Sequence, residues 1–230
     1  MNRAIVSLSV AAGLTAAVAA VSAAPAILQP GPESAQDTFV YQFLPTFNFD
    51  GPGWNALIAT GTTGTGHDIR GLIRFDLTGL SLDAGEVATL NLWVTDTAAA
   101  GFGVSPSPAA PVTTDLHLAT SSWTASTVTW ATQPTYNPAI IDSQLVDGIN
   151  RWVSFDVTAT VSQWLADPSG NFGFVATQRD IVNNGGRVMG VFEASAGQNR
   201  PYLQIAPIPE PSALALLGGT AMLLVRRRRV

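Results

Sequence analysis

Short runs in which apolar and polar residues alternate recur along most of the chain, and this pattern limits the folds open to it. Between residues 70 and 78, Ile73, Phe75 and Leu77 alternate with Arg74 and Asp76. A period of two is typical of a strand with one buried face. The separated runs therefore predict an all-β fold, an antiparallel sandwich or barrel. They lie at 37–41, 70–78, 87–96, 115–118, 153–157, 172–176, 188–194 and 202–205.

Other stretches predict the connections between these strands. Residues 98–113 are small and Pro-rich, and residues 61–66 consist of Gly and Thr, which is typical of loops. The longer stretch 44–66 is rich in Gly, Asn, Pro and Thr and includes a short apolar run at 56–59. Residues 158–166 predict one short helix, because Val161, Trp164 and Leu165 fall at i, i+3 and i+4. Thr158 is suited to cap the start of this helix.

The C-terminal segment, residues 208–230, has three parts. Pro209, Glu210 and Pro211 come first, residues 212–225 are apolar throughout, and Arg226, Arg227, Arg228 and Arg229 follow. An apolar run followed by Arg indicates a membrane segment with a cytoplasmic C-terminus. The run spans only about 21 Å as a helix, against about 30 Å of hydrocarbon, which suits transient insertion.

This segment resembles the PEP-CTERM sorting signal of bacteria that carry an exosortase. The resemblance implies a transmembrane sorting helix, an exosortase-type sorting machinery as partner, and release to the cell surface or extracellular matrix after processing. An ordinary tail anchor is the alternative, although such an anchor has no need of the Pro-Glu-Pro motif.

The N-terminal segment predicts export through the inner membrane. A basic start is followed by an Ala-rich apolar run and by small residues, which is typical of a secretory signal peptide. We expect the signal peptide at 1–24, with cleavage between 23 and 26, and a Pro- and Ala-rich lead-in at 25–36. One domain then covers 37–206, and the sorting signal covers 208–230.

The charge of the exported part narrows the choice of partners. Residues 24–207 contain six Arg, fifteen acidic residues and no Lys, which corresponds to a formal charge of −9. An acidic surface without Lys argues against nucleic acid and anionic lipid as partners. The chain contains no Cys, so it has neither disulfides nor thiol chemistry, and its core alone must hold an exported domain together.

Several motifs along 37–206 resemble the DNRLRE domain, a surface-protein domain related to the methanogen disaggregatase tail and to a family of carbohydrate-binding modules. The most specific motifs are Trp123 with Thr127–Trp130 and Pro134, and Trp152–Thr158 with Val161 and Trp164. The insert at 98–113 departs from the pattern. The resemblance implies a β-sandwich of jelly-roll type on a bacterial surface, often beside extracellular polysaccharide.

Residues able to carry catalysis are few. His67 and His117 are the only histidines, and neither has a partner at metal-ligand spacing. Asp76 and Asp156 could form a carboxylate pair for glycoside hydrolysis, but an Asp two residues before Thr at a strand end is more typical of a turn cap. We therefore expect a non-catalytic protein, with a polysaccharide-active enzyme, lyase or glycosidase, as the alternative.

Tryptophan residues offer candidate ligand contacts, because an aromatic face can stack on a sugar ring. Alternation places Trp93 on the polar face of its strand beside Asn91, and Trp54 lies in a Gly-rich loop. These three residues are the predicted ligand-binding residues. The alternative is that both Trp side chains only cover an edge or a loop. Trp123, Trp130 and Trp164 are expected in the core.

No cofactor is expected, although structural calcium is possible. Oxygen-bearing side chains that could hold calcium occur in loops and at strand starts, but their spacing matches no calcium motif. They are Asp37, Asp142, Asp180, Asn183 and Asn184.

Overall fold

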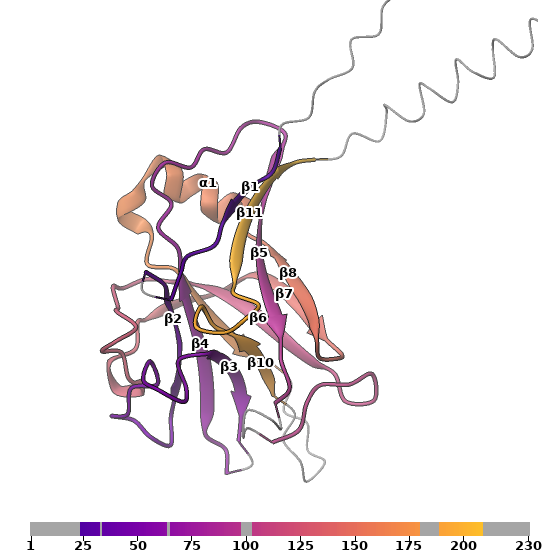
Figure 1. Ribbon diagram of the computed structural model, residues 1–230. Coiled ribbons are helices and arrows are strands. Elements are labelled where there is room, and N and C mark those ends of the chain that lie inside the picture. Colours follow the sequence, from indigo (N-terminus) through magenta and orange to yellow (C-terminus); the bar gives the residue numbers. More distant parts are fainter. Residues whose placement is uncertain (1–23, 33, 64, 98–102, 180–188, 209–230) are drawn as a thin grey trace, which may run out of the picture.

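A computed structural model describes residues 24–32, 34–63, 65–97, 103–179 and 189–208 (Figure 1). Strands dominate these residues, together with one α-helix and two short 3-10 helices. In chain order the elements are β1 (Ala26–Leu28), β2 (Gln36–Tyr41), β3 (Leu57–Thr62), β4 (Asp68–Arg74), β5 (Glu86–Val94), β6 (Val112–Ala119), η1 (Trp130–Thr132), β7 (Tyr136–Val146), β8 (Arg151–Asp156), α1 (Thr158–Ala166), η2 (Pro168–Gly170), β9 (Phe174–Gln178), β10 (Gly190–Glu193) and β11 (Tyr202–Pro207).

The strands pair antiparallel in two sheets. Sheet A contains β1, β11, β5, β8 and β10, and sheet B contains β2, β4, β9, β6 and β7. Strand β3 pairs with β10 of sheet A and with β4 of sheet B, so it joins the two sheets. This all-β fold with one short helix confirms the predicted sandwich in its general form. The jelly-roll connectivity stays a prediction.

The main core lies between the inner faces of the sheets. Leu90 and Leu92 of β5 belong to one buried cluster with Ile73 of β4, Leu116 of β6 and Phe174 of β9. Their burial explains the sequence pattern, because successive side chains of a strand point to opposite faces. The residues between Leu90, Leu92 and Val94 consequently point away from this core.

The predicted helix is confirmed over its full length, Thr158–Ala166, with Val161 and Trp164 buried. The predicted cap is wrong, because Val157 takes the cap position and Thr158 is the first helical residue. The Thr158 hydroxyl instead donates to the Asp156 carboxylate at 2.6 Å and accepts from the Ala88 N–H at 3.0 Å, which ties the helix start to β5.

Three strands escaped the sequence analysis. The lead-in predicted at 25–36 contains β1, which pairs with β11 at the far end of the chain. Strand β3 lies wholly within the Gly- and Pro-rich stretch 44–66, and its buried residues do not alternate. Strand β7 contains Pro138, which disfavours a central strand but is tolerated because β7 lies at the edge of sheet B.

The N- and C-terminal segments, from which export and sorting were predicted, lie mostly outside the described residues. The sorting motif from Pro209 onward and residues 1–23 of the signal peptide both fall there. Among the residues that the structure describes, no helix has both the length and the apolar character needed to cross a membrane. The described chain begins and ends on neighbouring strands, because Ala26 pairs with Ile205.

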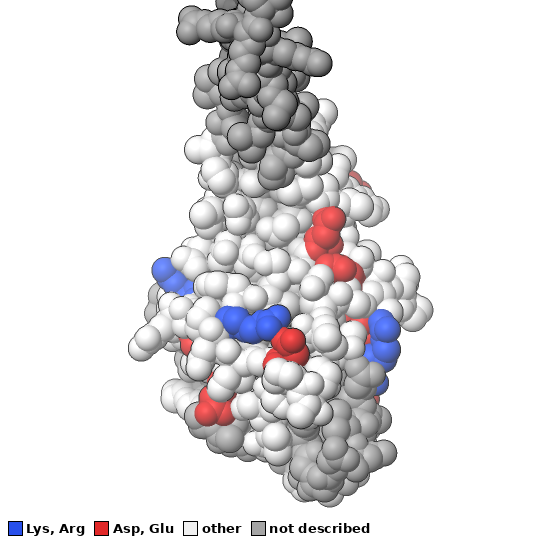
Figure 2. All heavy atoms as spheres, turned by 90° about the vertical axis from the view of Figure 1, so that its right-hand side faces the viewer, with Lys and Arg blue, Asp and Glu red and all other residues white. Residues whose placement is uncertain are grey.

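The described surface shows no concentration of positive charge on the side where β7 and β8 lie. Figure 2 shows this side, with a few Arg side chains scattered among acidic and uncharged ones. A nucleic-acid interface would need Lys and Arg gathered on one face. That nucleic acid is not the partner stays a prediction from the charge of the sequence.

Candidate functional site

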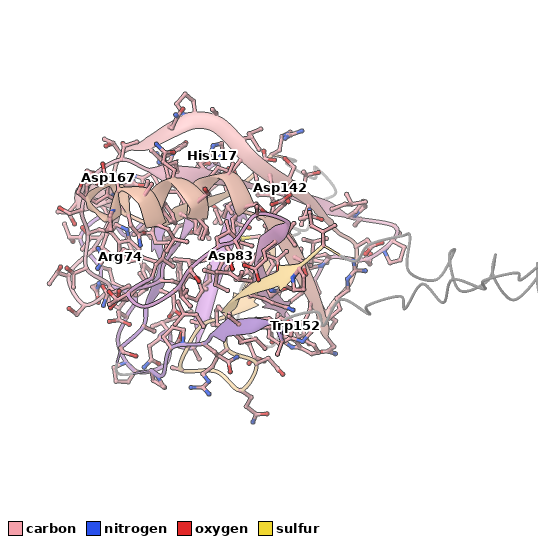
Figure 3. The ribbon with its side chains drawn as sticks, turned by 90° about the horizontal axis from the view of Figure 1, so that it is seen from above. Arg74, Asp83, His117, Asp142, Trp152 and Asp167 are labelled. Carbon is pink, nitrogen blue, oxygen red and sulfur yellow. The ribbon has the colours of Figure 1, made fainter. Side chains whose placement is uncertain are left out.

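The outer face of sheet A carries three aromatic side chains from three adjacent strands. Trp93 of β5 is directly opposite Trp152 of β8, and Tyr202 of β11 is opposite Asn91 of β5. We call Trp93, Trp152 and Tyr202 the aromatic platform. Figure 3 shows Trp152 on the opposite side of the molecule from α1 and from His117 of sheet B.

Ring contacts hold the platform together. The ring centroids of Trp93 and Trp152 are 5.4 Å apart with an interplanar angle of 70°, and those of Trp152 and Tyr202 are 5.0 Å apart at 74°. Both arrangements are of the edge-to-face kind that aromatic pairs prefer. Because β8 and β11 lie on opposite sides of β5, the two rings must meet above β5. They thereby cover Asn91, which is only 4% exposed.

Asn91 organises the polar side chains beside the platform. Its amide oxygen accepts a hydrogen bond of 2.6 Å from the Ser154 hydroxyl. Its amide nitrogen donates to the carbonyl and to the hydroxyl of Thr89, each at 3.2 Å. Asn91 thus positions Ser154 and Thr89 and is too deeply buried to contact a large ligand itself.

The platform remains accessible to a ligand. The Trp152 side chain is 36% exposed, whereas Trp93 and Tyr202 are half-buried. Ser154 is exposed beside them. Aromatic surface with hydroxyl groups at its margin can stack on the apolar face of a pyranose ring while the sugar hydroxyls form hydrogen bonds.

The predicted residue Trp54 lies elsewhere in the structure. It packs against Phe39 and Phe49 at the loop between β2 and β3, with ring centroids 6.3 and 5.8 Å away. The two Trp side chains proposed as ligand contacts therefore belong to different surfaces. Of the three expected core residues, Trp123 and Trp164 are buried, while Trp130 is half-buried under the guanidinium of Arg70.

The sequence analysis missed Trp152 and Tyr202 as candidate contacts. The signal was present, since Trp152 alternates with the buried Val153 and Phe155, and Tyr202 precedes the buried Leu203. Alternation therefore places both residues outward, as it does Trp93. It does not reveal that β8 and β11 flank β5, and only this pairing joins the three rings.

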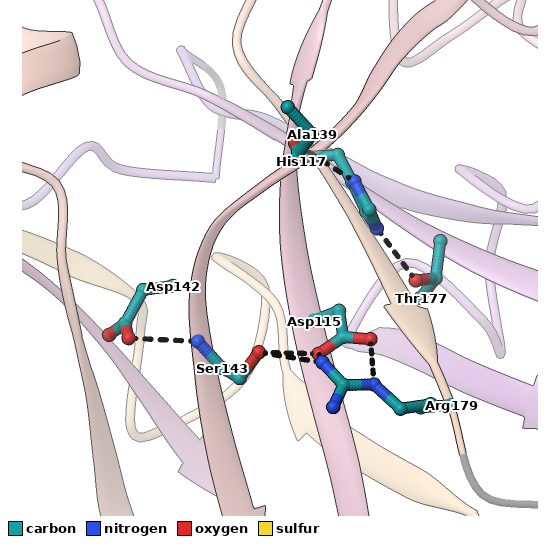
Figure 4. A network of polar contacts seen from close by, with 7 residues as sticks. All are labelled: Asp115, His117, Ala139, Asp142, Ser143, Thr177 and Arg179. Atoms are coloured by element: carbon teal, nitrogen blue, oxygen red, sulfur yellow. Dashed lines mark hydrogen bonds and ion pairs between the residues drawn. The ribbon is translucent and has the colours of Figure 1, made fainter.

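The histidines are held by hydrogen bonds. His67 Nδ1 lies 2.8 Å from the Thr65 hydroxyl. His117 is 7% exposed, with Nδ1 3.2 Å from the Ala139 carbonyl and Nε2 3.1 Å from the Thr177 hydroxyl (Figure 4). Because both ring nitrogens of His117 form hydrogen bonds, this side chain links β6 to β7 and to β9 within sheet B.

An ion pair lies close to His117 on the same face of sheet B. Arg179 contacts both carboxylate oxygens of Asp115 at 2.7 and 3.0 Å, and the Ser143 hydroxyl donates to the same carboxylate at 2.6 Å (Figure 4). Asp115 is 5% exposed. These partners compensate for the burial of the Asp115 carboxylate, which would otherwise be unfavourable. They also link β6 to β7 and to the end of β9.

Asp76 and Asp156 form the turn caps that the sequence predicted. Asp76 accepts hydrogen bonds from the hydroxyl and the N–H of Thr78, at 2.6 and 3.0 Å. Asp156 accepts the equivalent bonds from Thr158, at 2.6 and 2.9 Å. These bonds lower the pKa of each carboxyl group, and the bond from the Thr hydroxyl has the larger effect. Both groups are therefore ionised at neutral pH, which is unsuited to a general acid.

The two proposed calcium ligands that the structure describes, Asp37 and Asp142, are each engaged in hydrogen bonds within the protein. The Asp37 carboxylate accepts hydrogen bonds from the backbone and the hydroxyl of Ser195, and Asp142 accepts them from the N–H groups of Ser143 and Asp156. Asp180, Asn183 and Asn184 lie outside the described residues. Within the described part of the chain, no three His, Asp or Glu side chains lie together as a metal site.

The fold places the chain in the all-β class, and its exposed aromatic platform is a surface on which a sugar ring can stack. The comparison with protein families makes the assignment specific: residues 32–207 match carbohydrate-binding module family 96, and the chain belongs to that family. The match covers nearly all of the described residues. The comparison with curated proteins found no similar sequence.

Membership of this family supports carbohydrate binding, a polysaccharide partner and an extracellular or cell-surface location. This agrees with the sequence resemblance to a surface-protein domain that is related to carbohydrate-binding modules. The DNRLRE assignment and the PEP-CTERM signal stay predictions.

Proposed function

We propose that this domain binds an extracellular polysaccharide by stacking pyranose rings on the aromatic platform. The supporting observation is the platform itself, in which Trp93, Trp152 and Tyr202 contact one another on an open sheet face. Ser154 and Thr89 supply hydroxyls beside it, held in position by Asn91. Antiparallel strands keep these side chains in register, so the site is rigid before ligand arrives, which lowers the entropic cost of binding.

The proposed role is binding without cleavage. Glycoside hydrolysis requires one carboxyl group that can donate a proton, which means a raised pKa. The two candidate carboxylates, Asp76 and Asp156, have lowered pKa values because of their Thr partners. The competing function is that of a polysaccharide-active enzyme, which would be either a lyase or a glycosidase. The experiment below distinguishes binding alone from cleavage.

The proposed location is the bacterial cell surface or extracellular matrix, reached through a signal peptide and an exosortase-type sorting machinery. The Pro209-Glu210-Pro211 motif, the apolar run 212–225 and the Arg cluster support sorting and transient membrane insertion. The chain positions next to both end segments lie on β1 and β11, which pair with each other. Both end segments therefore join the domain at neighbouring strands of sheet A.

Titration of the full chain with extracellular polysaccharide from the producing cell tests this function. We expect saturable binding and no new reducing or unsaturated chain ends. Trp152→Ala should weaken binding, whereas Phe47→Ala should not, because Phe47 is a comparably exposed aromatic residue (46%) outside the platform. New chain ends in proportion to protein would establish the enzyme instead. Equal affinity of both variants would exclude the platform as the site.

A further inference from the structure

A second concave surface lies among the loops that follow β2 and β3. It is a cleft of about 440 Å³, within the range of roughly 300–1,000 Å³ that is typical of small-ligand sites. Its walls include Tyr41, Phe43, Phe49 and Trp54. No platform residue takes part in it.

Aromatic rings form a connected series along one wall of this cleft. Phe49 is buried at 3% exposure, with the ring of Trp54 5.8 Å away and that of Tyr41 6.5 Å away. Phe43 lies 5.9 Å from Tyr41 and is 58% exposed. A rigid, buried base thus supports an outermost ring that lies open to solvent. Such an exposed ring is costly to hydrate and is available for stacking.

Hydroxyl groups occupy another part of the lining. Thr63 and Thr65 both line the cleft, and their hydroxyl oxygens are 3.0 Å apart. The Thr65 hydroxyl also lies 2.8 Å from His67 Nδ1, and the His67 ring contacts Phe43 edge-to-face at 5.1 Å. The hydroxyls are therefore fixed close to the exposed aromatic ring.

Charge is absent from the lining residues that the structure describes, which besides those already named are Leu44, Ile69, Gly103 and Met189. An uncharged lining offers no counter-ion for a carboxylate or a sulfate, whose burial without a partner is unfavourable. Aromatic rings beside fixed hydroxyls match a ring that has one apolar face and several hydroxyl groups.

We infer that this cleft is a second carbohydrate-binding site, which takes one neutral hexose or pentose unit of a polysaccharide. The inference rests on the proposed function, because it extends sugar binding to a second surface. Two sites on one domain raise the avidity for a long chain through effective concentration, or allow one domain to join two chains.

Binding of neutral oligosaccharides to the full chain tests the inference. Calorimetric titrations would use hexasaccharides of glucose, mannose and xylose, with hexagalacturonate as an anionic comparison. Phe43→Ala should raise the Kd for the neutral sugar bound at the cleft by roughly 5- to 150-fold, the scale of one lost stacking contact. Phe43→Tyr should retain affinity. Phe47→Ala is the comparison on the same loop, because Phe47 is exposed and does not line the cleft; its ring packs on Phe49 at 4.7 Å, so urea unfolding of both variants must first show that each is folded like the wild type.

Parallel titration of Trp152→Ala separates this inference from the proposed function. Loss of one binding event in Phe43→Ala and of another in Trp152→Ala would support both sites. An effect of Trp152→Ala alone would overturn the cleft and leave the platform. An effect of Phe43→Ala alone would overturn the platform and leave the cleft as the site. Unchanged binding in both, or stronger binding of hexagalacturonate than of any neutral sugar at the cleft, would refute the inference.

Discussion

Replacing Trp93 by Ala separates a ligand-binding tryptophan from a structural one. The side chain is half-buried on the outer face of sheet A and contacts Trp152 edge-to-face. Its loss removes one stacking surface, which we expect to weaken polysaccharide binding by ~1–3 kcal/mol. It also removes one aromatic pair, which contributes ~0.5–1.5 kcal/mol to stability. No enclosed cavity forms, because the site opens to solvent.

Trp164 provides the matched comparison, since it has the same side chain in the core. It is 4% exposed and packs on Phe174 at 4.8 Å between ring centroids. Trp164→Ala should lower the free energy of unfolding by ~3–5 kcal/mol, because the enclosed site leaves a cavity. Binding per folded molecule should stay close to that of the wild type, since Trp164 lies away from the platform.

Urea unfolding of both variants gives the free energy of unfolding, and polysaccharide titration gives the dissociation constant. Binding constants must be expressed per folded molecule. The expected result is a crossed pattern, in which Trp93→Ala loses mainly affinity and Trp164→Ala loses mainly stability. If Trp93→Ala unfolds as easily as Trp164→Ala and binds polysaccharide normally, Trp93 is structural and our account of the platform is wrong.

Three further predictions concern other parts of the chain. Burial raises the pKa of the Asp37 carboxyl group above its ordinary value of 3.8, although its hydrogen bonds to Ser195 act in the opposite direction. Protonated Asp37 therefore contributes stability that is complete below pH 3.8 and is lost as the pH rises through the folded-state pKa. The stability of wild type relative to Asp37→Asn should fall over that window, and a flat difference would contradict this. Gly173→Ala should cost on the order of 2–4 kcal/mol in urea unfolding, because its φ is +83° and an added Cβ would lie 2.4 Å from the Ile73 carbonyl; an unchanged midpoint would count against it. Intact mass of surface protein should show loss of the Arg tail, and replacing residues 209–211 by Ala should retain the protein in the inner membrane; mature chains that end at Val230 would refute sorting.

Local features of this chain were predictable from its sequence. Helix α1 and the caps of Asp76 and Asp156 depend on residues within four positions of one another, so their spacing is sufficient. The outward direction of Trp93 followed from alternation with Leu92 and Val94, both fully buried. Such inferences succeed because a strand has a fixed period of two.

Neighbours across the sheets were decided by the tertiary structure. Trp93, Trp152 and Tyr202 come from strands far apart in the sequence, and alternation gives the face of each ring without giving its partner strand. The same reason accounts for β1, whose three residues form a strand only because β11 supplies the hydrogen bonds. Asn91 shows the effect most clearly: its sequence position marks it as an exposed polar residue, but two rings from the flanking strands meet above it and bury it.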